Sequence, residues 1–73
     1  MPIIDIAATG QNIKKIMTDN DMTVKDMQDI FGFNTGQAIY KWFQGKCLPT
    51  IDNMVILATI FHVTVDDILV IRK

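Results

Sequence analysis

Residues 34–45 have the sequence NTGQAIYKWFQG and predict a short amphipathic helix. When the residues are placed at about 100° each, the apolar side chains fall within one arc: Ala38, Ile39, Trp42 and Phe43. The polar side chains fall within the opposite arc: Gln37, Tyr40, Lys41 and Gln44. We therefore expect one face of this helix to be buried and the other to be open to a partner.

The polar arc carries side chains whose hydrogen-bonding groups fit DNA. Gln37 can pair with adenine in bidentate fashion, and Lys41 can reach the acceptor atoms of guanine. Tyr40 can donate its hydroxyl to a phosphate or lay its ring on a thymine methyl group. Most surface helices are amphipathic, however, so the arc by itself is also consistent with an ordinary solvated face.

The length and composition predict one small domain. The 73 residues leave no room for a separate sensor or catalytic domain, and one Cys with one His makes neither a disulfide nor a metal site. The chain is 49% hydrophobic but has no run of the roughly 18 apolar residues that a membrane span needs, so the apolar surplus points to an oligomer. The N-terminus lacks the features of a secretory signal, and we expect a cytoplasmic protein without a cofactor, a metal or a small-molecule domain.

The net charge of −1 argues mildly against nucleic acid, because DNA-binding domains usually carry a basic excess. Five lysines nevertheless lie before residue 50: Lys14, Lys15, Lys25, Lys41 and Lys46. Five aspartates balance them in the same half: Asp5, Asp19, Asp21, Asp26 and Asp29. We therefore expect no tight non-specific binding to DNA.

Five threonines stand where apolar periodic runs begin and predict five helix N-caps: Thr9, Thr23, Thr35, Thr50 and Thr64. Asp26 and Asp67 lie three residues after two of them, as in a capping box. The predicted helices cover about 10–20, 24–31, from the Thr35 cap to 44, 51–61 and about 65–70. No hairpin signal competes, so the sequence predicts an all-α fold.

The apolar positions on these helices define the expected core. The first helix is expected to bury Ile13, Ile16 and Met17; the second, Met27, Ile30 and Phe31; the fourth, Ile51, Met54, Leu57, Ala58 and Phe61; and the fifth, Ile68 and Leu69. Gly32 lies directly after the second helix, where a residue with a left-handed backbone conformation is expected. Because only residues 32–34 separate that helix from the Thr35 cap, the pair forms a helix-turn-helix pattern, whose second helix enters the major groove.

Three groups of residues together resemble the lambda-repressor-like, Cro/cI-type helix-turn-helix family. They are QAI-x-KW-xx-G at 37–45, P-x-IDN at 49–53 and F-x-V-xx-DDIL at 61–69. Within that family the chain is similar to small Xre-type regulators of Firmicutes and their mobile elements. The resemblance covers about residues 10–69, with 1–9 as an N-terminal segment and 70–73 as a tail of a single domain, 1–73.

The resemblance implies a compact five-helix domain that binds duplex DNA in bacterial cytoplasm, usually as a homodimer on a palindromic operator. The base-reading residues are expected to be Gly36, Gln37, Tyr40 and Lys41. Seven residues around them are expected to contact phosphates: Thr23, Lys25, Thr35, Gln44, Lys46, Lys14 and Lys15.

The sequence also departs from the family pattern. Val24 stands where a polar group usually meets a phosphate, and Gln28 stands where a small Ala is usual. The stretch 32–42 is one residue longer than usual, which together with Gln28 predicts a slightly opened turn. Cys47 occupies a loop position that is often basic, and Phe43 replaces a usual Glu.

Three other residues have a structural and a functional reading. Trp42 is expected to anchor the core rather than to stack on single-stranded bases. His62 is expected to end the fourth helix in left-handed geometry rather than to carry proton or metal chemistry. Cys47 is read as incidental, with thiol sensing as the alternative.

Ile56 and Ile60 are predicted on the outer face of the fourth helix, where with Val70 and Ile71 they would form a two-fold dimer patch. The alternative is scattered surface apolar residues. The leading function is a DNA-binding transcriptional regulator, with repression the expected mode. The rival is a protein-interaction module of the same fold, such as an antitoxin or an anti-regulator, which the pI of about 5.5 favours. No catalytic constellation is present in the sequence, so an enzyme is not expected.

Overall fold

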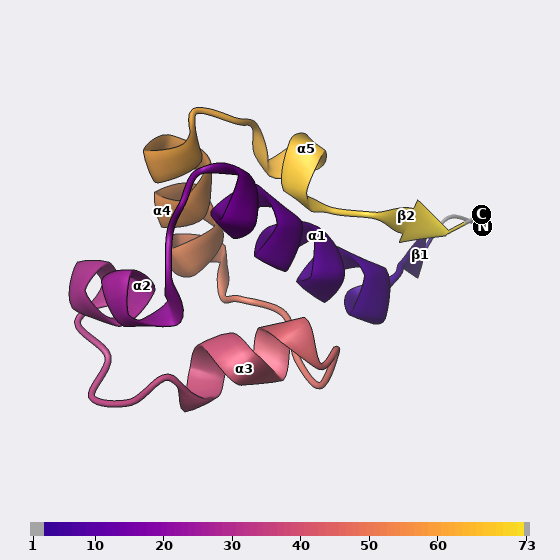
Figure 1. The fold of residues 1–73 in the computed structure, drawn as a ribbon. Coiled ribbons are helices and arrows are strands. Elements are labelled where there is room, and N and C mark those ends of the chain that lie inside the picture. Colours follow the sequence, from indigo (N-terminus) through magenta and orange to yellow (C-terminus); the bar gives the residue numbers. More distant parts are fainter. Residues whose placement is uncertain (1–2, 73) are drawn as a thin grey trace.

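A computed structural model describes residues 3–72 and contains five helices and one short strand pair. The helices are α1 (Ile6–Asp19), α2 (Val24–Phe31), α3 (Gln37–Phe43), α4 (Ile51–Phe61) and α5 (Val65–Ile68). β1 (Ile3–Ile4) and β2 (Ile71–Arg72) pair in antiparallel fashion, with Ile3 opposite Arg72 and Ile4 opposite Ile71. The helical fold and the helix-turn-helix of α2 and α3 agree with the sequence prediction (Figure 1).

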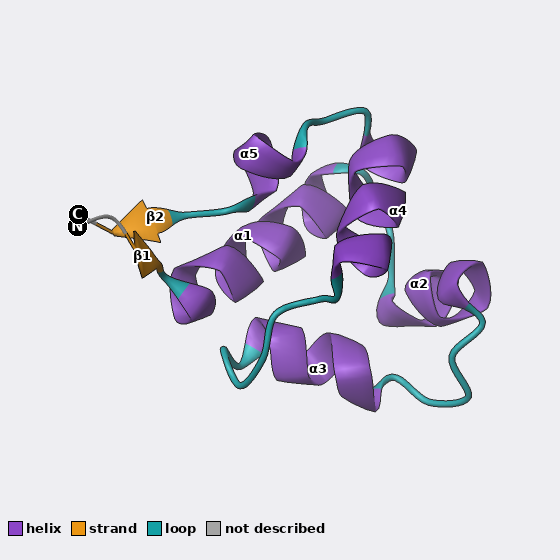
Figure 2. Ribbon diagram, turned by 180° about the vertical axis from the view of Figure 1, so that it is seen from behind, coloured by secondary structure: helices purple, strands orange, loops and turns teal. Residues whose placement is uncertain are grey.

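The core lies among all five helices and is almost entirely apolar. Its buried side chains are Ile13 and Met17 of α1, Met27 of α2, Ile39 and Trp42 of α3, Met54, Leu57 and Phe61 of α4, and Ile68 of α5. The most extensive contact between two elements joins α1 to α3. The strand pair lies at the N-terminal end of α1, far from α2, as both ribbon views show (Figure 2).

Four of the predicted caps have the expected chemistry, in part or in full. Thr23 and Thr64 form complete capping boxes with Asp26 and Asp67, and the Thr50 hydroxyl accepts from the backbone of α4. At α3 the N-cap position is Gly36, and the Thr35 hydroxyl accepts from the Gln37 N–H at 3.3 Å, one residue out of register. Gly32 and His62 adopt left-handed geometry after α2 and α4, which confirms both predictions.

The predicted start of the first helix was wrong. The N-cap of α1 is Asp5, whose carboxylate accepts from the Ala8 N–H at 3.0 Å, and Thr9 lies inside the helix. Thr9 is fully buried, and its hydroxyl accepts from the Val70 N–H at 2.9 Å. The hydroxyl that the sequence assigned to a cap therefore holds the C-terminal segment against α1.

Two core assignments were also wrong. Ile30 is 45% exposed, because Phe31 takes the inward position at the end of α2. Ile51 is 82% exposed because it lies in the first turn of α4, before the buried Met54. α4 is apolar on nearly all sides, so its sequence does not fix which side faces inward. The exposed line of α4 runs through Ile51, Val55 and Thr59.

The segments at the two ends, which the sequence left unassigned, hold each other. The Asp5 N–H donates to the Val70 carbonyl at 2.8 Å, next to the β1–β2 pair. α5 ends at Ile68, earlier than predicted, because Leu69 is already extended and leads into β2. The predicted end segments 1–9 and 70–73 include Met1, Pro2 and Lys73, which lie outside the described residues.

Candidate nucleic-acid interface

Helix α3 presents the polar face that the sequence predicted. Gln37, Tyr40, Lys41 and Gln44 are all exposed, and Tyr40 keeps 52% of its surface accessible. On the opposite side Ile39 is fully buried and Trp42 is 3% exposed. The buried arc therefore fixes the rotation of the helix, and the four polar side chains form an exposed ridge.

Three aromatic rings hold the joint between α2 and α3. Phe31 and Phe33 stack with their ring centroids 5.2 Å apart, on either side of Gly32. Both rings meet the Trp42 ring edge-on, at 5.7 and 6.1 Å between centroids. No role was predicted for Phe33, although two Phe residues flanking a predicted left-handed Gly could have indicated a packed turn. This cluster packs the joint between α2 and α3 against the buried side of α3.

Gly36 lies where the start of α3 passes close to α2. A Cβ atom on Gly36 would lie 2.9 Å from Val24 Cγ1 and 3.4 Å from Gln28 Oε1. The absence of a side chain at Gly36 therefore makes room for Val24 and Gln28, the two residues of α2 that depart from the family pattern. Gly36 is half-buried, and its predicted contact with bases stays a prediction.

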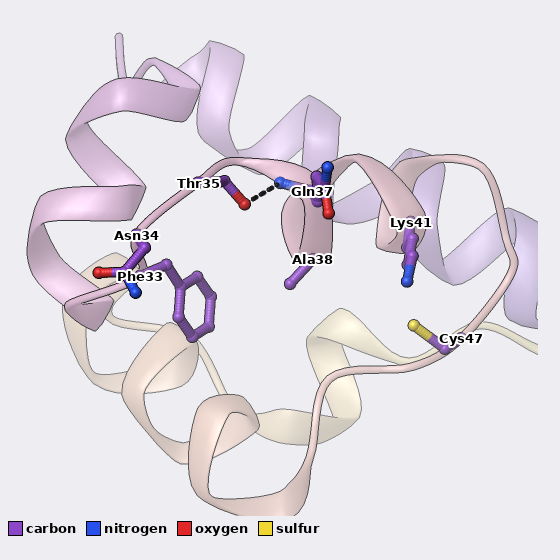
Figure 3. A pocket seen from close by; sticks show the side chains of 7 residues that line it. All are labelled: Phe33, Asn34, Thr35, Gln37, Ala38, Lys41 and Cys47. Atoms are coloured by element: carbon purple, nitrogen blue, oxygen red, sulfur yellow. Dashed lines mark hydrogen bonds between the residues drawn. The ribbon is translucent and has the colours of Figure 1, made fainter.

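Two hollows flank the ridge of α3. One, of about 420 Å³, lies toward the loop after α3 and is here called the Cys47 hollow. Its lining includes Asn34, Thr35, Gln37, Lys41 and Cys47. Figure 3 shows Lys41 and Cys47 pointing toward one another across it.

The other hollow, of about 590 Å³, lies toward α1 and is here called the Lys14 hollow. Gln11 and Lys14 of α1 line one wall, and Tyr40, Phe43 and Gln44 line the other. Lys14 Nζ lies 5.9 Å from the centroid of the Phe43 ring, and Gln11 Nε2 donates to the Phe43 carbonyl at 2.8 Å. Lys14 and Gln44, both predicted phosphate contacts, thus lie beside Tyr40, which is predicted to read bases.

The remaining predicted phosphate contacts are more dispersed. Lys15 pairs with Asp19 at 2.8 Å, and Lys25 pairs with Asp29 at 3.1 Å, both on exposed helix surface. The hydrogen bond and the charge of Asp19 raise the pKa of Lys15. Lys46 is exposed in the loop after α3. The contacts of these lysines with phosphates stay predictions.

Thr23 and Asp26 are engaged with each other at the start of α2. The Thr23 hydroxyl accepts from the Asp26 N–H at 3.1 Å, and the Thr23 N–H donates to the Asp26 carboxylate at 2.9 Å. The backbone hydrogen bond, with a contribution from the Thr23 hydroxyl, lowers the pKa of Asp26. The Thr23 hydroxyl oxygen is already engaged as the helix cap. The predicted phosphate contact of Thr23 would therefore have to be a hydrogen bond that the hydroxyl donates.

The predicted dimer residues differ in their exposure. Ile56, Ile60 and Val70 are half-buried, and Ile60 packs against the core, whereas Ile71 is exposed. The prediction that Ile60 lies on the far side of α4 was therefore wrong. A third, apolar hollow of about 210 Å³ lies elsewhere, and its lining includes Ile4, Leu48, Ile51, Val55 and Leu69. We call it the Ile51 hollow.

Further features of the described residues concern Cys47, metal-binding clusters, membrane spans and Trp42. Cys47 is exposed and unpaired, and residues 3–72 contain no cluster of His, Cys, Asp or Glu that could hold a metal. Within the same range, no helix has the length and the apolar character that crossing a membrane requires. Trp42 is a core residue, as expected.

The sequence was also compared with known proteins. The model of the Cro/C1-type HTH DNA-binding domain matches residues 12–73. No curated protein and no solved structure gave a match to the chain. The matched range contains α2, α3 and the whole of the α3 ridge.

Proposed function

The chain belongs to the Cro/C1-type HTH DNA-binding family, and from that premise we propose that it is a sequence-specific regulator of transcription that reads duplex DNA through the α3 ridge. The observation that carries this proposal is the division of α3 into a buried arc and an exposed polar one. A helix of this kind fits the major groove, which is about 12 Å wide.

Within the ridge, Gln37 and Lys41 supply base discrimination. Both have amide or amine groups that reach the acceptor and donor atoms of purines in the major groove. Tyr40 and Gly36 complete the reading surface. Thr23, Lys25, Thr35, Gln44, Lys46, Lys14 and Lys15 hold the helix in register on the phosphates.

The test is a selection of bound sites from random duplex DNA, followed by affinity measurements on two variants. Gln37→Ala is expected to lose roughly 1 to 3 kcal/mol on the selected site and to relax the base preference at one position. Lys25→Ala, on the same half of the domain, is expected to lower the affinity for all DNA sequences alike. It should also lower the slope of log affinity against log salt by about one. Equal weakening of every sequence by both variants would remove Gln37 from the base-reading set.

The regulator is further proposed to act as a homodimer on a palindromic operator. Two copies of α3 would then lie in successive major grooves about 34 Å apart. Repression would follow from occupation of a promoter. The exposed apolar residues support an association of this kind, since Ile51, Val55 and Ile71 are 82%, 54% and 49% exposed.

Two surfaces compete as the dimer contact, and matched substitutions separate them. Val55→Asp changes the exposed line of α4 beside the Ile51 hollow, and Ile60→Asp changes the patch predicted from the sequence. Sedimentation of the Val55 variant as a folded monomer would assign the contact to the Ile51 hollow. A monomeric and folded Ile60 variant with an unchanged Val55 variant would assign it to the original patch.

A protein-interaction module of the same fold is the second candidate function. The Ile51 hollow favours it, because an apolar surface of this kind also suits a protein partner. A gel shift on the DNA upstream of the gene, with and without the products of the neighbouring genes, distinguishes the two. Binding by the protein alone supports the regulator, whereas binding that requires or is abolished by a neighbour's product supports the interaction module.

A further inference from the structure

The two flanks of the α3 ridge each carry a lysine, but the two lysines come from different elements. Lys14 of α1 lines the Lys14 hollow, whereas Lys41 of α3 itself lines the Cys47 hollow, opposite the Cys47 thiol. A helix in the major groove has one sugar-phosphate strand on each side, so each hollow faces one strand. On the α1 side the cation therefore comes from a second helix, and its position relative to α3 depends on the contacts that hold it there.

Phe43 is the residue that connects Lys14 to the ridge. Its ring meets the Tyr40 ring edge-on, at 6.0 Å between centroids and 86° between planes. Lys14 Nζ lies 5.9 Å from the same ring, within the range in which an ammonium group is attracted to an aromatic face. The Phe43 ring thus contacts both Tyr40, which is proposed to read bases in the groove, and Lys14, the cation at the α1 edge of α3.

The backbone around Phe43 is fixed by α1 as well. Gln11 Nε2 donates to the Phe43 carbonyl, and Gly10 leaves room for the backbone of Trp42 and Phe43 to lie directly on α1. Lys14 follows Gly10 and Gln11 by one helical turn and so lies on the same face of α1. The backbone of Lys14 is therefore held next to α3, and the Phe43 ring restricts the positions that the Lys14 ammonium group can take.

We propose that Phe43 is a positioning residue that holds the Lys14 ammonium at the α1 edge of α3, where it binds a phosphate of the DNA strand on that side. The proposal rests on the proposed function and adds to it the residue that positions one of the phosphate-contacting lysines, Lys14. Lys14 becomes the principal cation of this edge. The neighbouring Lys15 is committed to Asp19 and faces no part of the Lys14 hollow.

The experiment is a double-mutant cycle on DNA affinity with Phe43→Leu, Lys14→Ala and the two combined. Phe43→Leu is expected to weaken binding about two- to fivefold, the size of an exposed cation–π contact. Lys14→Ala is expected to weaken binding further and to lower the slope of log affinity against log salt by about one. In the Lys14→Ala background, Phe43→Leu is expected to have no further effect.

Two controls make the cycle specific. Lys15→Ala removes the same charge one residue away and is expected to change affinity less than Lys14→Ala. Phe43→Tyr keeps an aromatic ring and is expected to bind as the wild type does. If Phe43→Leu weakens binding equally with and without Lys14, its effect is structural and the proposal is overturned; equal effects of Lys14→Ala and Lys15→Ala also overturn it.

A measurement without DNA separates this proposal from the proposed function. The ring current of Phe43 should shift the side-chain methylene protons of Lys14 relative to those of Lys15 in proton NMR spectra, and Phe43→Leu should abolish the difference. If the two lysines have the same shifts in the wild type, the positioning is overturned. If the shifts differ as expected but the wild type selects no DNA site, the proposed function fails instead.

Discussion

The two helices of the helix-turn-helix are held by different means. α2 has a complete capping box at Thr23 and Asp26 and a left-handed Gly32 at its end. The N-cap position of α3 is Gly36, which has no side chain to cap the helix, and the nearby Thr35 hydroxyl makes only a long hydrogen bond of 3.3 Å. The ends of α2 are thus specified by neighbouring residues, whereas α3 depends on contacts from elsewhere in the fold.

α1 supplies most of those contacts. A Cβ atom on Gly10 would overlap the Trp42 carbonyl, so this glycine allows α1 to touch the backbone of α3. A Cβ atom on Gly45 would lie 2.7 Å from Ala7 Cα, so Gly45 allows the loop after α3 to lie equally close to α1. None of these contacts uses the exposed ridge. Substitutions on the exposed ridge of α3 are therefore expected to leave these supporting contacts in place.

The largest effect is expected from Gly10→Ala. The added methyl group meets backbone atoms of Trp42, which cannot rotate away, so α3 must move or the chain must unfold. We expect a loss of about 3 kcal/mol in the free energy of unfolding, measured by urea denaturation. A loss well below 1 kcal/mol would show that α1 does not fix the position of α3.

Gly32→Ala is the matched control at the other helix. Gly32 has a φ of 71° and no atom within 4 Å of the Cβ position, so alanine is disfavoured there only by its backbone conformation. We expect a loss of about 1 to 2 kcal/mol. A larger loss than for Gly10→Ala would reverse the comparison between the two helices.

A smaller effect separates the two threonines before these helices. Thr23→Ala removes one half of a capping box and is expected to lower the free energy of unfolding by about 1 kcal/mol. Thr35→Ala removes only the long bond to Gln37 and is expected to cost less than about 0.5 kcal/mol. The same denaturation experiment gives both values, and equal losses would mean that α3 also relies on its local cap.

The smallest effect concerns the acid side of the pH–stability profile. The backbone hydrogen bond from Thr64, helped by the Thr64 hydroxyl, lowers the pKa of Asp67, as Thr23 lowers that of Asp26. A carboxyl group whose pKa is lower in the folded state stabilises the fold above its unfolded pKa, and this contribution is lost as the pH falls through the folded pKa. Stability should therefore decrease below about pH 4.

Asp67→Asn should reduce that decrease, measured as urea midpoints between about pH 6 and pH 3. Asp66→Asn is the control, because the Asp66 carboxylate accepts no hydrogen bond from the described part of the chain. If Asp66→Asn flattens the profile and Asp67→Asn does not, the acid-side loss of stability comes from Asp66 and the prediction is wrong.

The same contrast explains what could be predicted from the sequence. α2 and the start of α5 were correctly bounded because Thr23, Thr64 and their aspartates are local signals. α3 was recognised because Ile39 and Trp42 alternate with polar residues at helical spacing. The exposed ridge followed from that spacing alone.

The errors arose where local signals were absent or ambiguous. Thr9 resembles a cap, yet its hydroxyl is used by Val70, which is distant in sequence. α4 is apolar on most sides, so its pattern did not place Ile51 and Ile60 correctly. The Lys14 hollow brings together residues about thirty positions apart, and no sequence pattern predicts such a contact.

The β1–β2 pair also determines how the domain would respond to tension. Its two strands run antiparallel and Ile3 lies opposite Arg72, so a force applied between these two residues pulls the strands apart sideways and does not slide one strand along the other. The pairing would then open in order, from Ile3 and Arg72 to the hydrogen bond that the Asp5 N–H donates to the Val70 carbonyl. Stretched between two handles, the domain should therefore unzip from its ends at low load, before any helix is sheared from the core.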